Sequence, residues 1–297
     1  MSTATAPPSS PRRRLSAALY RRRWAKLLLL LTPPLGWLGV VYLGALVAML
    51  VTSLYTTNVL FQVVHTYSFT NFRTLWNEPV YRAITERTVG MALAVTVTDA
   101  LLAFPLAYFM VRIASPRLRA FLFVGVLMPL WSSYLIKAYT WKLIMANDGS
   151  LNWALEKLGI GSVHVIFTYW ALWITLSYIW LPYMVLPIFA ALDRIPGSLL
   201  EASGDLGSRA FGTFRRVTLP LALPGIAAGS IFTFSLTLGD YIAVKLLTNS
   251  QFLGNAIADN FGVANNVPLA AAISVIPILI MVVYLTIMKR AGAFEGL

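Results

Sequence analysis

The chain has 297 residues, of which 58% are hydrophobic and 11% are charged, and its formal net charge is +12. Soluble domains carry about 25% charged residues, so this composition excludes a soluble enzyme and a disordered protein and indicates a chain solvated mainly by lipid. The absence of cysteine excludes disulfides, thiolate metal sites and cysteine nucleophiles.

The first 25 residues are predicted to form a basic, disordered arm. Residues 1–10 are rich in Ser, Thr, Ala and Pro, and six arginines follow before residue 26. The next apolar stretch is about twice as long as the 7–15 residues of a signal-peptide core, which favours an uncleaved membrane anchor. We expect the arginines to orient the chain and contact anionic lipid, and we expect no nucleic acid as a partner.

Six apolar runs are long enough to cross a bilayer, which takes about 20 residues. They are approximately Lys26–Leu54, Thr88–Val111, Arg119–Leu143, His164–Leu192, Leu221–Leu247 and Pro268–Met288. The prediction is an all-α polytopic membrane protein whose domain covers residues 26–290, with a short tail at 291–297.

The basic residues are distributed unevenly between the two sides of the predicted membrane. Of 23 Lys and Arg, sixteen lie on the side of the termini: six in the arm and Lys26 directly after it, three after the second span, four after the fourth and two at the C-terminus. Because cytoplasmic loops carry an excess of Lys and Arg, both termini are predicted to be cytoplasmic.

Placing an ionisable residue inside a membrane span costs free energy, so such residues are candidates for functional sites. In the second span, Asp99 has Thr96 and Thr98 as potential hydrogen-bond partners, which favours a structural role at a helix contact. In the third span, Lys137, Trp131 and Tyr134 are candidates for lining a transport pathway, although aromatic residues in membrane proteins more often pack or lie at the interface.

The polar segment 193–220 between the fourth and fifth spans has features of two short helices. Pro196 suits a first helical turn, Ser198 and Glu201 have the spacing of a capping box, and Gly207 permits a left-handed stop. A second helix is expected to follow, with Phe211, Phe214 and Val217 on one face, and to end at Leu219-Pro220. A loop of this length is more often functional than a simple connection.

This segment resembles the signature loop of ABC importer permeases. That signature is Glu-Ala-Ala, three residues, Gly, nine residues, an aliphatic residue, any residue and Leu-Pro. Here it reads Glu201, Ala202, Ser203, Gly207, Val217, Leu219 and Pro220, with Ser in place of the second Ala and Val in place of Ile. The resemblance implies a type I ABC importer permease (MetI-like) fold and a coupling helix that docks on a cytoplasmic ATPase.

The resemblance covers roughly residues 27–289 and is greatest to the polyamine (spermidine/putrescine) and opine branch of these permeases. Four stretches carry it: Leu135–Trp141, Leu181–Pro187, Leu219–Gly225 and Leu238–Tyr241. Relatives in this branch also carry sulfate, molybdate or iron, so these solutes stay open.

Asp240 is the preferred substrate candidate of the fifth span. It follows Gly239 and precedes Tyr241, and a carboxylate beside an aromatic ring suits an organic cation. The alternative is that Asp240 pairs with Lys245 or Lys137 and only holds helices together.

No enzyme motif was found. A Gly-rich loop followed by Lys-Ser/Thr is absent, so ATP hydrolysis is assigned to a separate chain. The two histidines, His65 and His164, form no metal-ligand cluster, and no cofactor is expected.

The resulting hypothesis is the permease subunit of a binding-protein-dependent ABC importer in the bacterial inner membrane. Its expected partners are two ATPase subunits, a second homologous permease, membrane lipid and a binding protein that docks on the outer loops 55–87 and 147–163. The alternatives are a secondary transporter, which broken helices in an inverted repeat would favour, and a membrane-embedded enzyme.

Overall fold

The computed structural model describes residues 23–58, 62–290 and 292. They form helices joined by short loops and one small hairpin, and the chain divides into two units, Met1–Thr52 and Ser53–Leu297. The predicted arm, up to residue 22, and nearly all of the predicted tail lie outside the described residues. The division into arm, permease domain and tail therefore stays a prediction.

The described part of the first unit, residues 23–52, is one apolar helical run. It consists of α2 (Arg23–Leu38), the π-helical turn η1 (Gly39–Leu43) and α3 (Gly44–Thr52). Its segment Leu27–Thr52 has 26 residues and is long and apolar enough to cross a membrane. No residue in the most apolar stretch of this segment is buried within the described structure. A helix that is apolar all round requires lipid or another protein as its surroundings.

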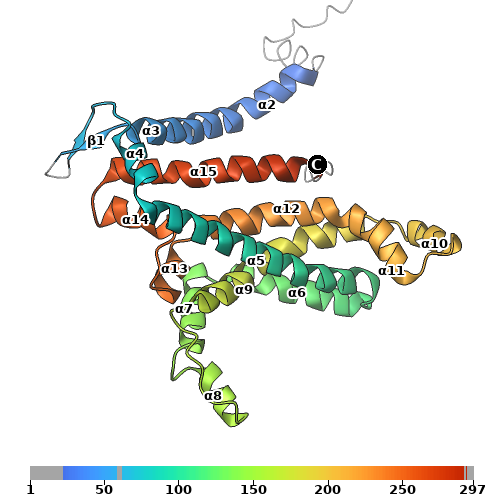
Figure 1. The fold of residues 1–297 in the computed structure, drawn as a ribbon. Helices are drawn as coiled ribbons and strands as arrows, with labels where there is room; N and C mark the ends of the chain where they lie inside the picture. Colours follow the sequence, from blue (N-terminus) through green and yellow to red (C-terminus); the bar gives the residue numbers. More distant parts are fainter. Residues whose placement is uncertain (1–22, 59–61, 291, 293–297) are drawn as a thin grey trace, which may run out of the picture. The chain divides into compact units, whose positions relative to one another are not determined.

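The second unit is a helical bundle with a small hairpin at its beginning (Figure 1). The two strands β1 (Thr56–Thr57) and β2 (Val63–Val64) pair antiparallel. The helices that carry most of the bundle are α4 (Thr70–Asn77), α5 (Pro79–Arg112), α6 (Pro116–Trp131), α7 (Tyr134–Ile144), α8 (Ser150–Lys157), α9 (Tyr169–Asp193), α12 (Leu219–Leu238), α13 (Ile242–Leu247), α14 (Leu253–Gly262) and α15 (Val267–Arg290).

Helices α5, α9 and α12 form the centre of this unit and pack against one another (Figure 1). Small residues allow their backbones to approach closely, as is typical of helices packed in lipid. On α5, Ala92, Ala103 and Ala107 are completely buried. On α12, a Cβ atom added at Gly229 would lie 2.7 Å from the Met184 sulfur of α9.

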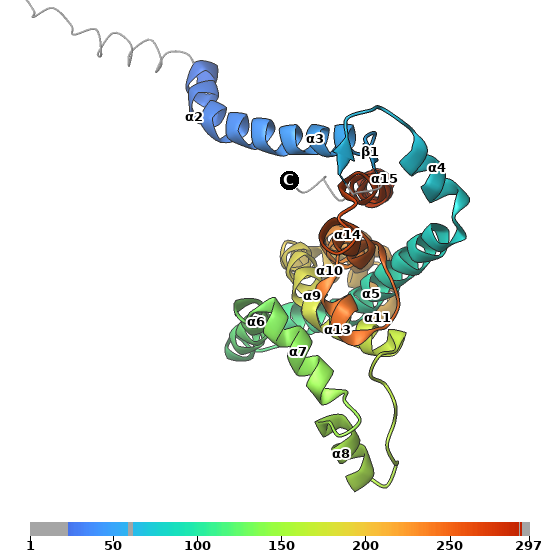
Figure 2. The ribbon, with the colours of Figure 1, turned by 90° about the vertical axis from the view of Figure 1, so that its left-hand side faces the viewer.

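Among the described residues, five helices are long and apolar enough to cross a membrane, or six if the bent pair α6–α7 is one span. This agrees with the predicted all-α membrane protein. The predicted continuous third span, however, bends by 97° between Trp131 and Tyr134 (Figure 2). The break is stabilised by local hydrogen bonds, since the Ser132 hydroxyl and the Lys137 ammonium both donate to the Pro129 carbonyl, at 2.9 and 3.0 Å.

The predicted fifth span is also interrupted. Helix α12 ends at Leu238, and α13 begins at Ile242 after the short break formed by Gly239, Asp240 and Tyr241. The Asp240 carboxylate accepts a hydrogen bond from the Ala243 amide at 2.9 Å and so satisfies a free N–H group at the start of α13. Hydropathy alone misses this break because apolar residues continue on both sides of it.

Candidate functional site

The first half of the signature loop is the helix α10 (Gly197–Asp205). Gly207 has φ +79°, which confirms the predicted left-handed stop. The predicted capping box of Ser198 and Glu201 is wrong: the N-cap is Pro196, without a side-chain hydrogen bond, so Ser198 lies inside the first turn. Glu201 and Ala202 are exposed on this helix.

The second half does not end at Leu219-Pro220 as predicted. Helix α11 (Ala210–Thr213) continues through the π-helical turn η2 (Phe214–Thr218) directly into α12. Proline lacks an N–H and its ring clashes with the carbonyl four residues earlier in an α-helix. The wider turn η2 precedes Pro220, which then occupies the first turn of α12, where proline is tolerated.

Side chains hold the two halves of the loop together and attach them to the bundle. The hydroxyls of Ser203 and Thr213 are 2.9 Å apart, so the serine that replaces the second Ala of the signature links α10 to α11. Phe214 packs edge-on against Phe104 of α5, with 5.6 Å between ring centroids. The loop is therefore an ordered projection that is anchored to α5.

The outer surface of the loop combines apolar and basic residues. Leu206 is 89% exposed and Phe211 is 73% exposed, whereas Arg209, Arg215 and Arg216 are exposed nearby in the sequence. Large exposed apolar side chains with polar neighbours are typical of surfaces that bind another protein.

Asp240 lies in the break between α12 and α13 and is only 8% exposed. Its carboxylate accepts hydrogen bonds from the Tyr134 hydroxyl of α7 and from the Ala243 amide. Gly254 of α14 packs against the same break, since an added Cβ there would lie 2.9 Å from the Gly239 carbonyl oxygen. Helices α7 and α13 thus hold this carboxylate, and α14 packs against the break that carries it.

Aromatic rings extend the site along α9. The Trp180 ring is stacked on Tyr134 at 5.6 Å with 12° between planes, and it contacts the Tyr183 ring edge-on at 5.8 Å. The Trp180 Nε1 and the Thr237 hydroxyl are buried without a hydrogen-bond partner among the described residues. Trp180, Tyr183 and Thr237 are not among the residues predicted from the sequence. The available signal was the three-residue spacing of Trp180 and Tyr183, which places both on one side of a helix.

The structure brings together only two of the five predicted pathway residues, Asp240 and Tyr134. Lys137 donates to the Pro129 carbonyl instead, Trp131 is 92% exposed and Tyr241 is 46% exposed. The role of these three residues in a pathway stays a prediction.

The alternative that Asp240 forms an ion pair with Lys245 or Lys137 is wrong. The ammonium of Lys245 pairs with Asp259 of α14 at 2.5 Å, and the ammonium of Lys137 donates to the Pro129 carbonyl. Within the part of the chain that the structure describes, no basic side chain lies within salt-bridge distance of Asp240.

Asp99 is fully buried in α5, and neither carboxylate oxygen has a hydrogen-bond partner among the described residues. The predicted bonds from Thr96 and Thr98 do not form. The Thr96 hydroxyl donates to the Ala92 carbonyl at 2.7 Å, and the Thr98 hydroxyl accepts from the Trp173 indole at 3.1 Å. The structural role of Asp99 at a helix contact stays a prediction.

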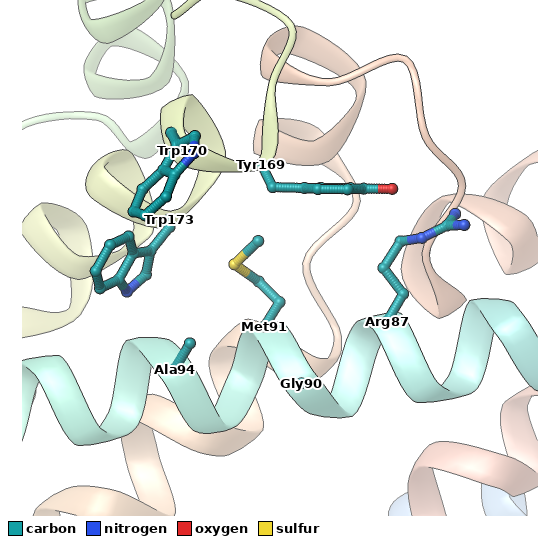
Figure 3. Close-up of a pocket in the computed structure, with 7 residues that line it drawn as sticks. All are labelled: Arg87, Gly90, Met91, Ala94, Tyr169, Trp170 and Trp173. Atoms are coloured by element: carbon teal, nitrogen blue, oxygen red, sulfur yellow. The ribbon is translucent and has the colours of Figure 1, made fainter.

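A separate pocket of about 380 Å³ lies between the N-terminal half of α5 and the first turns of α9 (Figure 3). Its lining is mostly apolar, and the Arg87 and Tyr169 side chains point toward each other across it. The Arg87 guanidinium donates to the Gln251 carbonyl at 2.8 Å and lies over the Tyr169 ring at 5.8 Å. A fixed positive charge makes this pocket unsuitable for a cationic ligand.

The described residues contain no group of three or more His, Cys, Asp or Glu side chains arranged to hold a metal ion. His65 lies edge-on to the Tyr55 ring, with 4.7 Å between centroids.

The family model "binding-protein-dependent transport system inner membrane component" matches residues 95–293. The chain belongs to this family. It is a permease subunit of an ABC importer and a multi-pass protein of the inner membrane. Such an importer works with a binding protein and an ATPase, so this chain is a transport subunit and not an enzyme.

Two curated relatives illustrate the similarity. The chain is 45% identical over 286 residues to the inner membrane ABC transporter permease protein YdcU of Escherichia coli strain K12, covering 91% of each chain. It is 33% identical over 226 residues to the spermidine/putrescine transport system permease protein PotB of Haemophilus influenzae, covering 75% of this chain and 78% of the relative.

The fold is similar to that of a solved importer. A chain of the bacterial alginate ABC transporter, crystallised in complex with an alginate pentasaccharide-bound periplasmic protein, superposes with a TM-score of 0.74 at 17% identity, covering 93% of this chain and 96% of that one. This likeness supports the predicted type I importer permease fold and carries no information about the solute.

Proposed function

We propose that this permease carries a polyamine such as spermidine or putrescine, or a related small organic cation, into the cytoplasm. The observation that carries this proposal is the buried Asp240 carboxylate, which has Tyr134 and the stacked Trp180 ring beside it and no basic partner among the described residues. The PotB relatives, whose names specify spermidine and putrescine, support the same solute class.

The chemistry of the site favours a cation over the other solutes that the family carries. A carboxylate accepts up to about four hydrogen bonds, and Tyr134 and the Ala243 amide supply two, so lone pairs remain for an ammonium group. Aromatic ring faces attract cations as well. Sulfate would be repelled by Asp240, and iron would require more than this one carboxylate.

We also propose how the subunit is assembled and driven. Two ATPase subunits dock on α10 of this permease and of a second, homologous permease, and the binding protein docks on the outer loops 55–87 and 147–163. Support for docking at α10 comes from its signature residues and from the exposed Leu206 and Phe211, which lie at its end and in the neighbouring α11. ATP-driven closure of the ATPases then moves the α10 helices and switches access to the pathway from outside to inside, with both termini of the chain in the cytoplasm.

The substitution Asp240→Asn tests the substrate assignment. In the importer purified with its partner subunits and reconstituted in vesicles, we expect uptake of labelled spermidine to fall about tenfold or more. The reason is that a charge-assisted hydrogen bond contributes about 1.5–3 kcal/mol, and 1.4 kcal/mol is a factor of ten in affinity.

Asp259→Asn is the matched control, because it removes a carboxylate of α14 that forms a partly exposed pair with Lys245, outside the Asp240 site and outside the proposed docking surfaces. It should leave uptake unchanged. Unaltered spermidine uptake by Asp240→Asn would contradict the role of Asp240, and uptake of sulfate but not of polyamines by the unmodified importer would refute the solute class.

A further inference from the structure

Arg112, the last residue of α5, donates hydrogen bonds to the backbone at the end of α9, just before the proposed coupling helix α10. Its Nη2 atom donates to the Leu192 carbonyl at 3.0 Å and to the Ile195 carbonyl at 2.9 Å. Leu192 lies in the last turn of α9, and Ile195 lies between the end of α9 and the start of α10 at Gly197. One guanidinium therefore connects the end of α5 to the last turn of α9 and to the linker that leads into α10.

The bonded carbonyls explain why an arginine suits this position. The last carbonyls of a helix have no partner within the helix, and they carry the negative end of its dipole. A guanidinium satisfies such carbonyls with a planar, permanently charged group. Leu192 and Ile195 are buried, at 0% and 6% exposure, so water has little access to replace these bonds.

A second basic residue holds the same turn of α9 in a different way. Arg119 of α6 pairs with Asp193 at 2.9 Å and lies over the Phe189 ring at 4.8 Å. The two side chains of this pair are 35% and 48% exposed, so the pair contributes little by itself. Arg119 therefore serves as a comparison for Arg112, whose bonds go to backbone atoms beside α10.

The position of these bonds determines what they can transmit. A displacement of α10 reaches α9 through Arg194, Ile195 and Pro196, and proline limits the flexibility of that connection. Because Arg112 bonds to Ile195 and Leu192 on both sides of Arg194, movement of α10 is passed to α5 as well as to α9. Without Arg112, residues 194–196 would flex, and part of the movement of α10 would not reach α5.

We propose that Arg112 is a positioning residue that makes α5 move together with the coupling helix. This inference rests on the proposed coupling of α10 to an ATPase. Arg112 contacts neither the solute nor the ATPase, and its effect is on how much transport accompanies each ATP hydrolysed.

The experiment compares Arg112→Gln, Arg112→Lys and Arg119→Gln in the reconstituted importer with its binding protein and labelled spermidine. For Arg112→Gln we expect copurification of the ATPase and its basal hydrolysis to persist, while spermidine imported per ATP falls about fivefold or more, as the loss of about 1 kcal/mol implies. Arg112→Lys should recover part of the ratio, because it retains a cation at the end of α9, and Arg119→Gln should change it less than Arg112→Gln.

A second measurement reports directly on how firmly α10 is held next to the end of α9. The chain contains no cysteine, so a nitroxide label on Ser198→Cys reports on α10 alone. We expect the label to become more mobile in Arg112→Gln and less so in Arg112→Lys. This readout needs only the folded chain in detergent.

A reference variant, Gly207→Pro, disrupts the end of α10, because proline cannot adopt the positive φ of Gly207. Three results would overturn the inference: an unchanged ratio of spermidine to ATP in Arg112→Gln, an unchanged label, or loss of ATPase copurification with Arg112→Gln as severe as with Gly207→Pro. The last result would mean that Arg112 merely maintains the docking surface. Failure of the unmodified chain to retain any ATPase would instead refute the proposed function itself.

Discussion

The indole of Trp180 lies between two phenol rings, stacked on Tyr134 and edge-on to Tyr183. It is 9% exposed, and its Nε1 has no hydrogen-bond partner in the described part of the chain. Trp is the aromatic side chain that attracts cations most strongly, and the contribution ranges from about 0.5 to 2 kcal/mol. At the residue scale, Trp180 complements the charge of Asp240 with a polarisable ring face.

Replacing Trp180 tests this contribution. We expect Trp180→Leu to raise the KM for polyamine uptake about 2- to 30-fold, because about 0.5–2 kcal/mol of cation–π attraction is lost. Trp180→Phe keeps a ring in place and should raise KM less. Uptake measured over a range of spermidine concentrations separates KM from the maximal rate.

The control for this series is Trp24→Leu, which changes an exposed tryptophan of α2 far from Asp240 in the sequence. It should leave KM unchanged. Equal KM values for Trp180→Leu and the unmodified chain would contradict a role of the indole in holding the solute.

Residue type alone was enough to select Asp240 and Tyr134 as candidates, because a carboxylate in an apolar run is costly unless it has a function or a partner. It was not enough to select Trp180 and Tyr183. In a long apolar helix, tryptophan and tyrosine are also ordinary packing residues, and only the stacked geometry with Tyr134 distinguishes these two.

At the scale of elements, α9 and α12 flank the coupling loop and pack closely along their length. A Cβ atom at Gly225 would lie 2.5 Å from the Ala191 Cβ and 2.6 Å from the Pro187 carbonyl oxygen. The same contact is repeated one turn later between Gly229 and Met184. We infer that the two helices move as one body when the loop is displaced.

Two glycine-to-alanine substitutions test this close packing. Gly229→Ala should destabilise the protein by about 1–3 kcal/mol, since the added methyl group overlaps Met184. Gly90→Ala, in α5, should stabilise it by about 0.5–1 kcal/mol, because nothing lies within 4 Å of the added carbon. Thermal unfolding in the same detergent measures both.

The contrast between the two variants is the informative result, because both add one methyl group to a helix. Equal unfolding temperatures for Gly229→Ala and Gly90→Ala would show that α9 and α12 are separated or loosely packed at this level.

The elements also show where hydropathy misleads. The break at Gly239–Tyr241 and the continuous path from α11 through η2 into α12 both differ from the predicted boundaries. In each case a hydrogen bond or a proline decides the outcome, and an average over an apolar window contains neither. The 97° bend between α6 and α7 has the same origin.

At the scale of the whole molecule, the orientation in the membrane is a proposal that the uneven distribution of Lys and Arg supports. The absence of cysteine makes it testable with single-cysteine variants. Ser198→Cys in α10 should react with a membrane-impermeant maleimide only in inverted vesicles. Asp148→Cys, in the loop before α8, should react only in intact spheroplasts.

Both sites are exposed, so the reagent can reach them once the correct side is accessible. Full denaturation in detergent, which should label both variants, controls for reactivity. Labelling of Ser198→Cys in intact spheroplasts would contradict the proposed orientation and, with it, the contact between α10 and a cytoplasmic ATPase.

The sequence by itself determined the membrane class, the approximate spans, the signature loop and the family. These properties depend on hydropathy and charge summed over neighbouring residues or on fixed motif spacings along the chain, so they can be predicted without knowledge of the tertiary structure. Only the tertiary structure decided that Tyr134 donates to Asp240, 106 residues away, that Lys137 and Lys245 do not pair with Asp240, and that Arg112 bonds to the base of α10. Those contacts depend on how α5, α7, α9 and α13 pack, because groups distant in the sequence interact only when packing brings them within hydrogen-bond distance.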